Sequence, residues 1–185
     1  MYATMMALLA ETYPAVGANP LAAGGGGTCS YLYADHDGTP VVSSASCTIS
    51  AADLDTGSEP EPNDREYVRQ LGEHDHCDND DAGHILANRL GGKAVPTNLF
   101  PQSPHLNRGD WESFERQIYA CISPGNSRGA TLKWEFDYST SSDLRPTSAT
   151  YSASFSDTGS CDSVTHTYSN ACSKSVALGA EAASK

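Results

Sequence analysis

The chain has 185 residues, of which 38% are hydrophobic and 18% charged, and its formal net charge at pH 7 is −12. This length corresponds to one domain, because domains usually have roughly 100–200 residues. The longest apolar run, at 5–10, is far shorter than the ~20 residues that a membrane-spanning helix needs, so no membrane contact is expected. The acidic balance excludes the basic surface of an indiscriminate nucleic-acid binder. All 11 Lys and Arg residues lie at or after Arg65, which leaves room for one local phosphate site.

The first half of the chain predicts a leader, a hairpin and a short helix. A flexible leader is expected at 1–27, which ends in four glycines and shows no periodicity. This leader is not a clear signal peptide, because the basic residues that precede the apolar core of such peptides are missing. Alternation and turn residues predict strands at 28–33 and 41–49 around a turn at 35–38, then an acidic loop at 53–64, a short helix at 65–71 and a second acidic loop at 73–81.

The second half predicts one clear helix and further strands. Trp111, Phe114 and Ile118 recur at helical spacing within 108–121, and acidic residues lie in its first turn, where the helix dipole favours them. Alternating apolar and polar residues predict strands at 132–138, 149–155 and 163–169, before a frayed tail at 173–185. The fold class is therefore α+β, an antiparallel sheet with few helices packed on it, and 28–172 is one domain.

Six cysteines form an even set without a CxxC pair, namely Cys29, Cys47, Cys77, Cys121, Cys161 and Cys172. This pattern favours a disulfide framework in an oxidising compartment over a zinc site. Six free thiols in a cytosolic protein are the alternative. Six cysteines allow fifteen pairings, and the sequence does not choose among them. We expect Cys29–Cys47 and Cys161–Cys172 to close hairpins, which leaves Cys77–Cys121.

The segment 80–115 carries the residues with catalytic chemistry. His84 follows Gly83, and a histidine with a pKa near 6.5 is a suitable general base. Asn107 stands at the entrance of the predicted helix as its N-cap, and its amide oxygen suits a hard cation such as Mg²⁺. Glu115 lies two turns further along the helix. Each of the three also has a structural alternative: a buried core histidine, a cap without a ligand role, and a solvated helix residue.

This segment resembles the DNA/RNA non-specific endonucleases, the ββα-metal or His-Me finger nucleases. The residues 80–84 read Asp-Asp-Ala-Gly-His, which is similar to the branch of the family that modifies the DRGH motif. The resemblance implies that His84 is the general base, that Asn107 is the metal ligand and that Glu115 holds metal-bound waters. Asn98 and Gln102 match the polar pair of the family's Asn-x-x-Pro-Gln segment and belong to the expected site.

The main departure from the family is Ala82, which occupies the position of the motif arginine in the better-known members. The contribution of that arginine must therefore come from elsewhere or be missing. Candidates for contact with substrate phosphate are Arg108, Arg116 and Arg145, although each could equally be a solvated surface residue.

A second metal site is conceivable in the acidic loop around Cys77, which also holds His74 and His76. An EF-hand is rejected, because Arg89 falls at the twelfth position, where the calcium loop requires Glu. We expect a solvated acidic loop that is anchored by a disulfide through Cys77.

Together these features predict a secreted nuclease that depends on Mg²⁺, with Mn²⁺ as an alternative, and cuts DNA and RNA to leave 5′-phosphate ends, as the resemblance implies. No obligate protein partner is expected. Two alternatives remain: a catalytically inactive binding module with the same fold, and a toxin effector nuclease that is delivered into competing cells.

Overall fold

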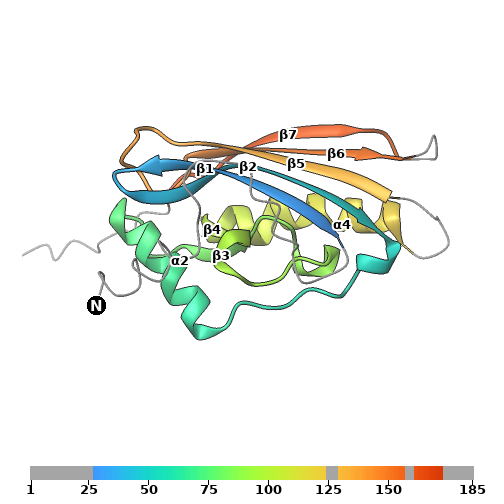
Figure 1. Cartoon of the computed structure of the whole chain (residues 1–185), viewed down its shortest axis with the longest axis horizontal. Coiled ribbons are helices and arrows are strands. Elements are labelled where there is room, and N and C mark those ends of the chain that lie inside the picture. The colour runs from blue at the N-terminus through green and yellow to red at the C-terminus, as the bar shows by residue number, and fades with distance from the viewer. Residues whose placement is uncertain (1–26, 124–128, 157–160, 173–185) are drawn as a thin grey trace, which may run out of the picture.

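The computed structural model describes residues 27–123, 129–156 and 161–172, and one antiparallel sheet forms its upper layer (Figure 1). The expected leader at 1–27, except for Gly27, and the tail at 173–185 lie outside the described residues. In spatial order the sheet contains β1 (Thr28–His36), β2 (Thr39–Ser50), β5 (Gly129–Asp137), β6 (Ser148–Phe155) and β7 (Val164–Ser169). The helices lie against one face of this sheet, so the expected α+β class is confirmed.

The alternation in the sequence determines which face of the sheet is buried. In β5 the side chains of Leu132 and Trp134 are buried while Lys133 and Glu135 are exposed. Trp134 stands opposite Ala45 on β2 and Tyr151 on β6, which are also buried, so the three strands contribute to one core. Burial of one face and solvation of the other is the usual arrangement of an antiparallel sheet.

The lower layer contains a second, two-stranded sheet and the helices. β3 (Asp81–His84) pairs with β4 (Leu99–Gln102), and the chain then enters α3 (Pro104–Leu106), η4 (Asn107–Trp111) and α4 (Glu112–Ile122). α4 places Phe114, Ile118 and Ile122 in the core under the large sheet. Figure 1 shows this strand–strand–helix unit under the large sheet. His84 at the end of β3 lines the same cleft as residues of the first turns of the helix.

α2 (Pro62–His74) is longer than the predicted helix at 65–71. Pro62 occupies its first turn, where the missing amide hydrogen costs nothing, so the helix begins inside the expected acidic loop. Three short 3₁₀ helices complete the structure, η1 (Ala51–Asp53), η2 (Asn88–Leu90) and η3 (Pro96–Asn98). Within the described ranges, no helix has the length and apolar character needed to cross a membrane.

The helix that contains Asn107 does not begin where the sequence indicated. Ser103 is its N-cap, since its hydroxyl oxygen accepts a hydrogen bond of 3.2 Å from the amide of Leu106. Asn107 has helical backbone angles and its own amide bonds to the carbonyl of Ser103, so the prediction that Asn107 is the cap was wrong. The helix continues through an irregular turn at Gly109, whose φ of −117° and ψ of −109° are not helical.

The described residues contain three disulfides: Cys29–Cys47, Cys77–Cys172 and Cys121–Cys161. The first joins opposed residues of β1 and β2, as predicted. The other two expected pairs were wrong. Cys161 and Cys172 lie at opposite ends of β7, and a strand of 6 residues keeps its ends about 20 Å apart. Cys161, before β7, therefore pairs with Cys121 of α4, and Cys172, after β7, pairs with Cys77 in the loop before β3.

Candidate active site

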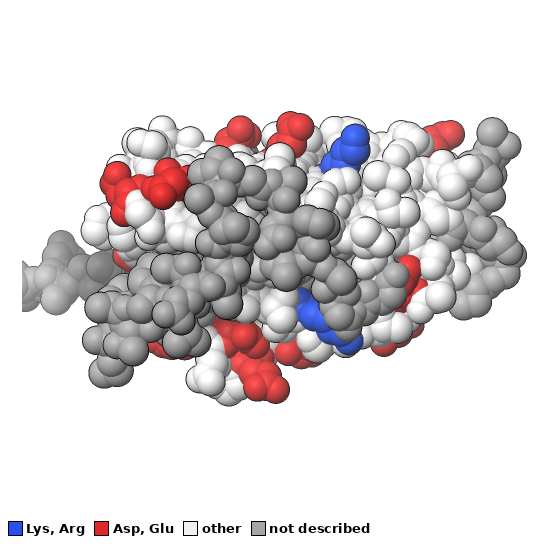
Figure 2. Space-filling view, viewed as in Figure 1, with Lys and Arg blue, Asp and Glu red and all other residues white. Residues whose placement is uncertain are grey.

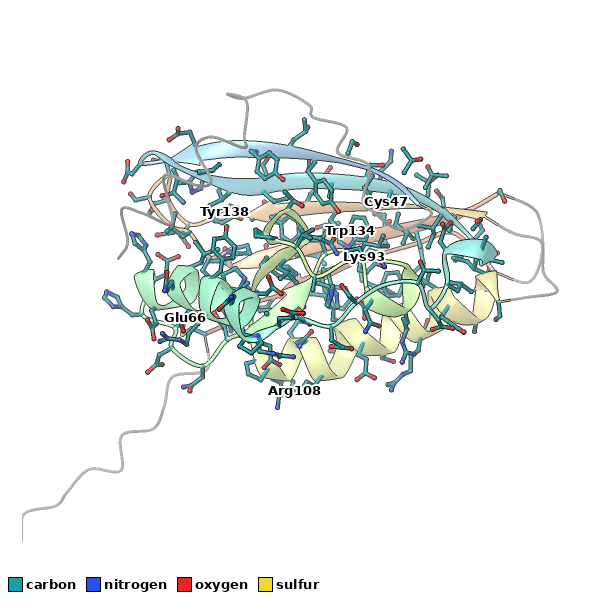
Figure 3. The ribbon with its side chains drawn as sticks, turned by 60° about the horizontal axis from the view of Figure 1, so that its bottom comes forward. Cys47, Glu66, Lys93, Arg108, Trp134 and Tyr138 are labelled. Carbon is teal, nitrogen blue, oxygen red and sulfur yellow. A yellow bond between two sulfur atoms is a disulfide. The ribbon has the colours of Figure 1, made fainter. Side chains whose placement is uncertain are left out.

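An open polar cleft of about 300 Å³ lies where the β3–β4 hairpin, the start of α2 and the α3–α4 helix meet. His84, Asn107 and Glu115 all line it, so the structure brings the three main predicted residues together. The other lining residues are Glu59, Pro60, Arg65, Asp81, Ala82, Ala87, Asn88, Arg89, Arg108 and Glu112. Figure 3 shows Arg108 projecting from the start of this helix toward solvent.

The tautomer of His84 is set by a backbone carbonyl. Nε2 of His84 lies 2.9 Å from the oxygen of Ser58, and a carbonyl oxygen only accepts, so Nε2 carries the hydrogen. Nδ1 is then the unprotonated nitrogen of the neutral ring. Burial lowers the pKa of His84 below its ordinary 6.5, and the positive charge of Arg65 acts in the same direction. The ring is therefore neutral near pH 7, which is the form that a general base requires.

The segment that holds His84 belongs to the loop at 53–64, which the sequence predicted only as an acidic loop. The amide of Ser58 bonds to the carbonyl of Gly92, and its hydroxyl accepts a hydrogen bond from the amide of Ala94. Gly57 allows this close approach, because a β-carbon there would lie 2.2 Å from the carbonyl oxygen of Asn88. The loop thus forms a fixed wall of the cleft.

Asp81 determines how the amide of Asn107 is turned. Nδ2 of Asn107 donates to the Asp81 carboxylate at 2.9 Å, and an ionised carboxylate only accepts, so the amide oxygen of Asn107 remains for the cleft. The guanidinium of Arg108 makes two more hydrogen bonds to Asp81, of 2.8 and 2.6 Å. Asp81 therefore fixes one predicted ligand and one predicted phosphate-binding residue at the same time.

Glu115 is a buried carboxyl group beside the cleft, only 8% exposed. Burial raises its pKa to about 8, while the polar indole of Trp111 and the charge of Arg89 act in the opposite direction. The indole nitrogen of Trp111 has no hydrogen bond of ordinary geometry among the described residues. Burial destabilises the ionised carboxylate of Glu115, and a cation bound in the cleft would offset this cost.

These residues fit a hydrated divalent cation. An amide oxygen from Asn107 and a carboxylate oxygen from Glu115 are the hard ligands that Mg²⁺ prefers, and Mg²⁺ usually keeps several of its waters. In the described part of the chain, no three His, Cys, Asp or Glu side chains gather into a metal-binding group. The cation would therefore be held by few protein atoms. The acidic loop around Cys77, as far as it is described, likewise contains no group of three such side chains.

The family model described as DNA/RNA non-specific endonuclease matches residues 27–155. The chain belongs to this family. The resemblance of the segment 80–115 is thereby confirmed. Probable deoxyribonuclease RhsA of Dickeya dadantii (strain 3937) is 39% identical over 116 residues, which make up 63% of this chain but 8% of that protein. The chain thus corresponds to a small part of a much longer relative.

Solved structures of nucleases share the fold. NucA from Streptococcus agalactiae, solved with magnesium ion bound, has a TM-score of 0.61 at 17% identity, covering 84% of this chain and 78% of its own. Sda1 nuclease, solved with bound zinc ion, has a TM-score of 0.58 at 17% identity, covering 78% and 76%. At such low identity the likeness concerns the fold alone.

Two polar residues expected at the site of this family member are buried outside the cleft. Asn98 holds the loop after His84: its amide bonds to both the N–H and the carbonyl of Leu86 and to the carbonyl of Lys93. Gln102 is 0% exposed and packs over Gly83, where a β-carbon would lie 2.2 Å from its amide oxygen. Both side chains thus support the β3–β4 hairpin and do not line the cleft, while the catalytic role of Asn98 and the substrate contact of Gln102 stay predictions.

Arg145 likewise does not reach the cleft. Its side chain is 4% exposed and pairs with Asp80 through two hydrogen bonds of 2.5 and 2.9 Å. It also bonds to Asn170, after β7, so it joins distant segments. The expected phosphate contact of Arg145 is therefore replaced by a structural ion pair. Arg116 is exposed and pairs with Glu112, which lines the cleft.

Sequence reasoning missed Ser58, Asp81, Arg65 and Arg89. Asp81 stands inside the recognised motif, so its position gave a signal. Ser58 acts through its backbone, which no side-chain pattern reveals. Arg65 precedes the motif, and the sequence does not show which way its helix faces. Arg89 lies over the ring of Tyr119, 5.9 Å from its centre, which is a tertiary contact.

Proposed function

We propose that this chain is a divalent-metal-dependent nuclease that hydrolyses phosphodiester bonds of DNA and RNA. The observation that carries the proposal is the placement of a neutral, tautomer-fixed His84 and the amide oxygen of Asn107 in one cleft. The family membership and the fold of nucleases such as NucA support the same reaction class.

In the proposed reaction, Nδ1 of His84 accepts a proton from a water molecule, and the water oxygen attacks phosphorus. The P–O3′ bond breaks and the leaving O3′ takes a proton from a second water molecule, so the products carry a 5′-phosphate and a 3′-hydroxyl. Asn107 and Glu115 would hold Mg²⁺, which supplies charge stabilisation at the phosphate and at the leaving oxygen. The carbonyl of Ser58 keeps the imidazole oriented and stabilises it once it is protonated.

The test compares His84→Ala with His74→Ala, a histidine exposed on α2 outside the cleft. We expect the parent and His74→Ala to degrade plasmid DNA and RNA with Mg²⁺ and to stop with EDTA. His84→Ala should be slower by about 10²–10⁴-fold, the usual contribution of a general base. Both variants should keep the circular dichroism of the parent. Undiminished cleavage by folded His84→Ala, or by all proteins in EDTA, would contradict the proposal.

We further propose secretion into an oxidising compartment, which three disulfides in a small acidic domain support. Peptide mapping of protein from its native source, without reduction, should recover the three cross-linked peptides. Free thiols at all six positions would contradict an extracellular location.

A second candidate is a nuclease unit of a longer effector protein that acts on DNA. It is favoured by the relative RhsA, of which this chain matches 8%. Sequencing of the full gene discriminates the two, because an effector requires a much longer open reading frame. The inactive binding module is tested by the same plasmid assay, since it predicts binding of nucleic acid without cleavage.

A further inference from the structure

Arg65 differs from the other arginines of the described ranges. Its guanidinium makes no ion pair or hydrogen bond there, although it lines the cleft. The others are engaged: Arg69 with Glu66 and Glu73, Arg108 with Asp81, Arg116 with Glu112, Arg145 with Asp80, and Arg89 over the ring of Tyr119. A cation that faces a polar cleft without a protein partner is available for an anionic ligand.

Helix geometry places Arg65 above the position where the motif lacks its arginine. Val68 of α2 is fully buried and packs with Ala82 of β3 and with Leu99 of β4. Arg65 precedes Val68 by three residues, so the two lie on the same face of the helix. Figure 1 shows α2 beside the β3–β4 hairpin. The side chain of Arg65 therefore extends from this contact into the cleft that Ala82 and His84 also line.

Position 82 itself supplies no charge. Ala82 is 8% exposed and belongs to the apolar cluster under α2. The charge of Arg65 is close enough to His84 to help lower the pKa of its imidazole. His84 must lie next to the attacked phosphate if it activates the attacking water. Because Arg65 lines the same cleft as His84, its guanidinium can reach a phosphate bound there.

We propose that Arg65 is a catalytic residue that binds a non-bridging oxygen of the scissile phosphate, and so takes from α2 the place of the motif arginine that is absent at position 82. This rests on the proposed nuclease function. The planar guanidinium can donate two parallel hydrogen bonds to phosphate oxygens. As water adds to phosphorus, negative charge grows on these oxygens, so the contact strengthens in the transition state.

The experiment is a steady-state comparison of the parent, Arg65→Gln, Arg65→Lys and Arg69→Gln on a dye-labelled oligonucleotide with saturating Mg²⁺. Arg69 is the matched control, because it lies one turn further along α2, is exposed, and is not part of the cleft. We expect Arg65→Gln to lower kcat by roughly 10²–10³-fold with a much smaller change in KM, as for the loss of one transition-state donor. Arg65→Lys should recover part of this loss, and Arg69→Gln should stay within about twofold of the parent.

The possible failures are distinguishable. If Arg65→Gln raises KM and leaves kcat unchanged, Arg65 binds a flanking phosphate and the assignment is overturned. Parental kinetics of Arg65→Gln, or an equal loss in Arg69→Gln, overturn it as well. A parent protein that does not cleave nucleic acid overturns the proposed function, and this assignment falls with it. Thermal unfolding of each variant checks the fold, and Arg65→Lys carries the test if Arg65→Gln unfolds.

Discussion

His84 and Asn107 each present two chemically different sides, and in each case a neighbour determines which side the cleft receives. The carbonyl of Ser58 leaves Nδ1 of His84 free of hydrogen, and the carboxylate of Asp81 leaves the amide oxygen of Asn107 for a cation. The chemistry of the site therefore depends on residues that do not react. Such partners are worth about 10–100-fold in activity or metal affinity at comparable sites.

The lowered pKa of His84 predicts the acid limb of the pH–rate profile. Only the neutral imidazole can accept a proton, and protonation increases as the pH falls, so kcat/KM should fall on the acid side. Since burial holds the pKa below 6.5, the midpoint should lie below pH 6.5, with a plateau toward neutrality. Measurements in buffers of constant ionic strength check this. A midpoint above pH 6.5 would contradict a pKa of His84 that is lowered by burial.

At the scale of the elements, the helix after β4 begins one turn earlier than its apolar periodicity indicated. Ser103 caps it, and Pro104 follows at the first helical position, which proline favours. Asn107 is therefore free of the capping role and uses its side chain for Asp81 and the cleft. The hydrogen bond of Asn107 to Asp81 ties this helix to the first residue of β3.

Substitution of Ser103 and Asn107 should separate stability from activity. Ser103→Ala removes the cap and should lower the free energy of unfolding by about 0.5–2 kcal/mol while cleavage at saturating Mg²⁺ persists. Asn107→Ala should cost less stability, because Arg108 still satisfies Asp81, but it should abolish most cleavage. Urea denaturation and plasmid assays of both variants provide the measurements. If Asn107→Ala were less stable than Ser103→Ala, Asn107 would be the residue that caps the helix.

The pair of Asp80 with Arg145 joins the start of β3 to the segment before β6, and both side chains are nearly inaccessible to water. Arg145→Met leaves the Asp80 carboxylate buried without its partner and should lower the free energy of unfolding by about 3–5 kcal/mol. Arg69→Ala, which breaks an exposed pair, should cost at most about 1 kcal/mol. Chemical denaturation measures both. A stable Arg145→Met protein with weakened DNA binding would instead support the phosphate contact expected from the sequence.

At the scale of the whole molecule, the proposed function requires an acidic protein to bind a polyanion. Figure 2 shows acidic side chains in several places on one face and little basic surface among the atoms that are not grey. The net charge of −12 opposes long-range approach, so we expect binding to depend on the arginines that line the cleft, Arg65, Arg89 and Arg108, and on the proposed cation.

Salt should therefore act on activity in two opposite ways. Two or three neutralised phosphates give a slope of log affinity against log salt of roughly −2 to −3, since each contributes about −0.9. Added salt also screens the repulsion, as the Debye length falls to about 8 Å near physiological ionic strength. We expect a shallow optimum at low to moderate salt in a titration of cleavage rate. Arg108→Ala should flatten the falling limb, whereas a steep monotonic loss would indicate a basic groove that the cleft does not contain.

The sequence by itself determined the five strands of the large sheet, the α+β class and the position of the motif, but not the strands β3 and β4. Alternation in 132–138 and the spacing of Trp111, Phe114 and Ile118 are local patterns, and each residue's burial follows from the period of its own element. The order of His84, Asn107 and Glu115 along the chain was likewise sufficient to indicate the nuclease family.

Only the tertiary structure decided which side chains meet. His84 bonds to Ser58, 26 residues away, and Arg145 pairs with Asp80, 65 residues away. Cys77 joins Cys172 across 95 residues because β7 carries the end of the chain back to the loop before β3. Such contacts depend on how elements pack, and local periodicity does not encode which face of one element meets another. For this reason Arg145 is a buried structural residue, while Arg65 lines the same cleft as His84.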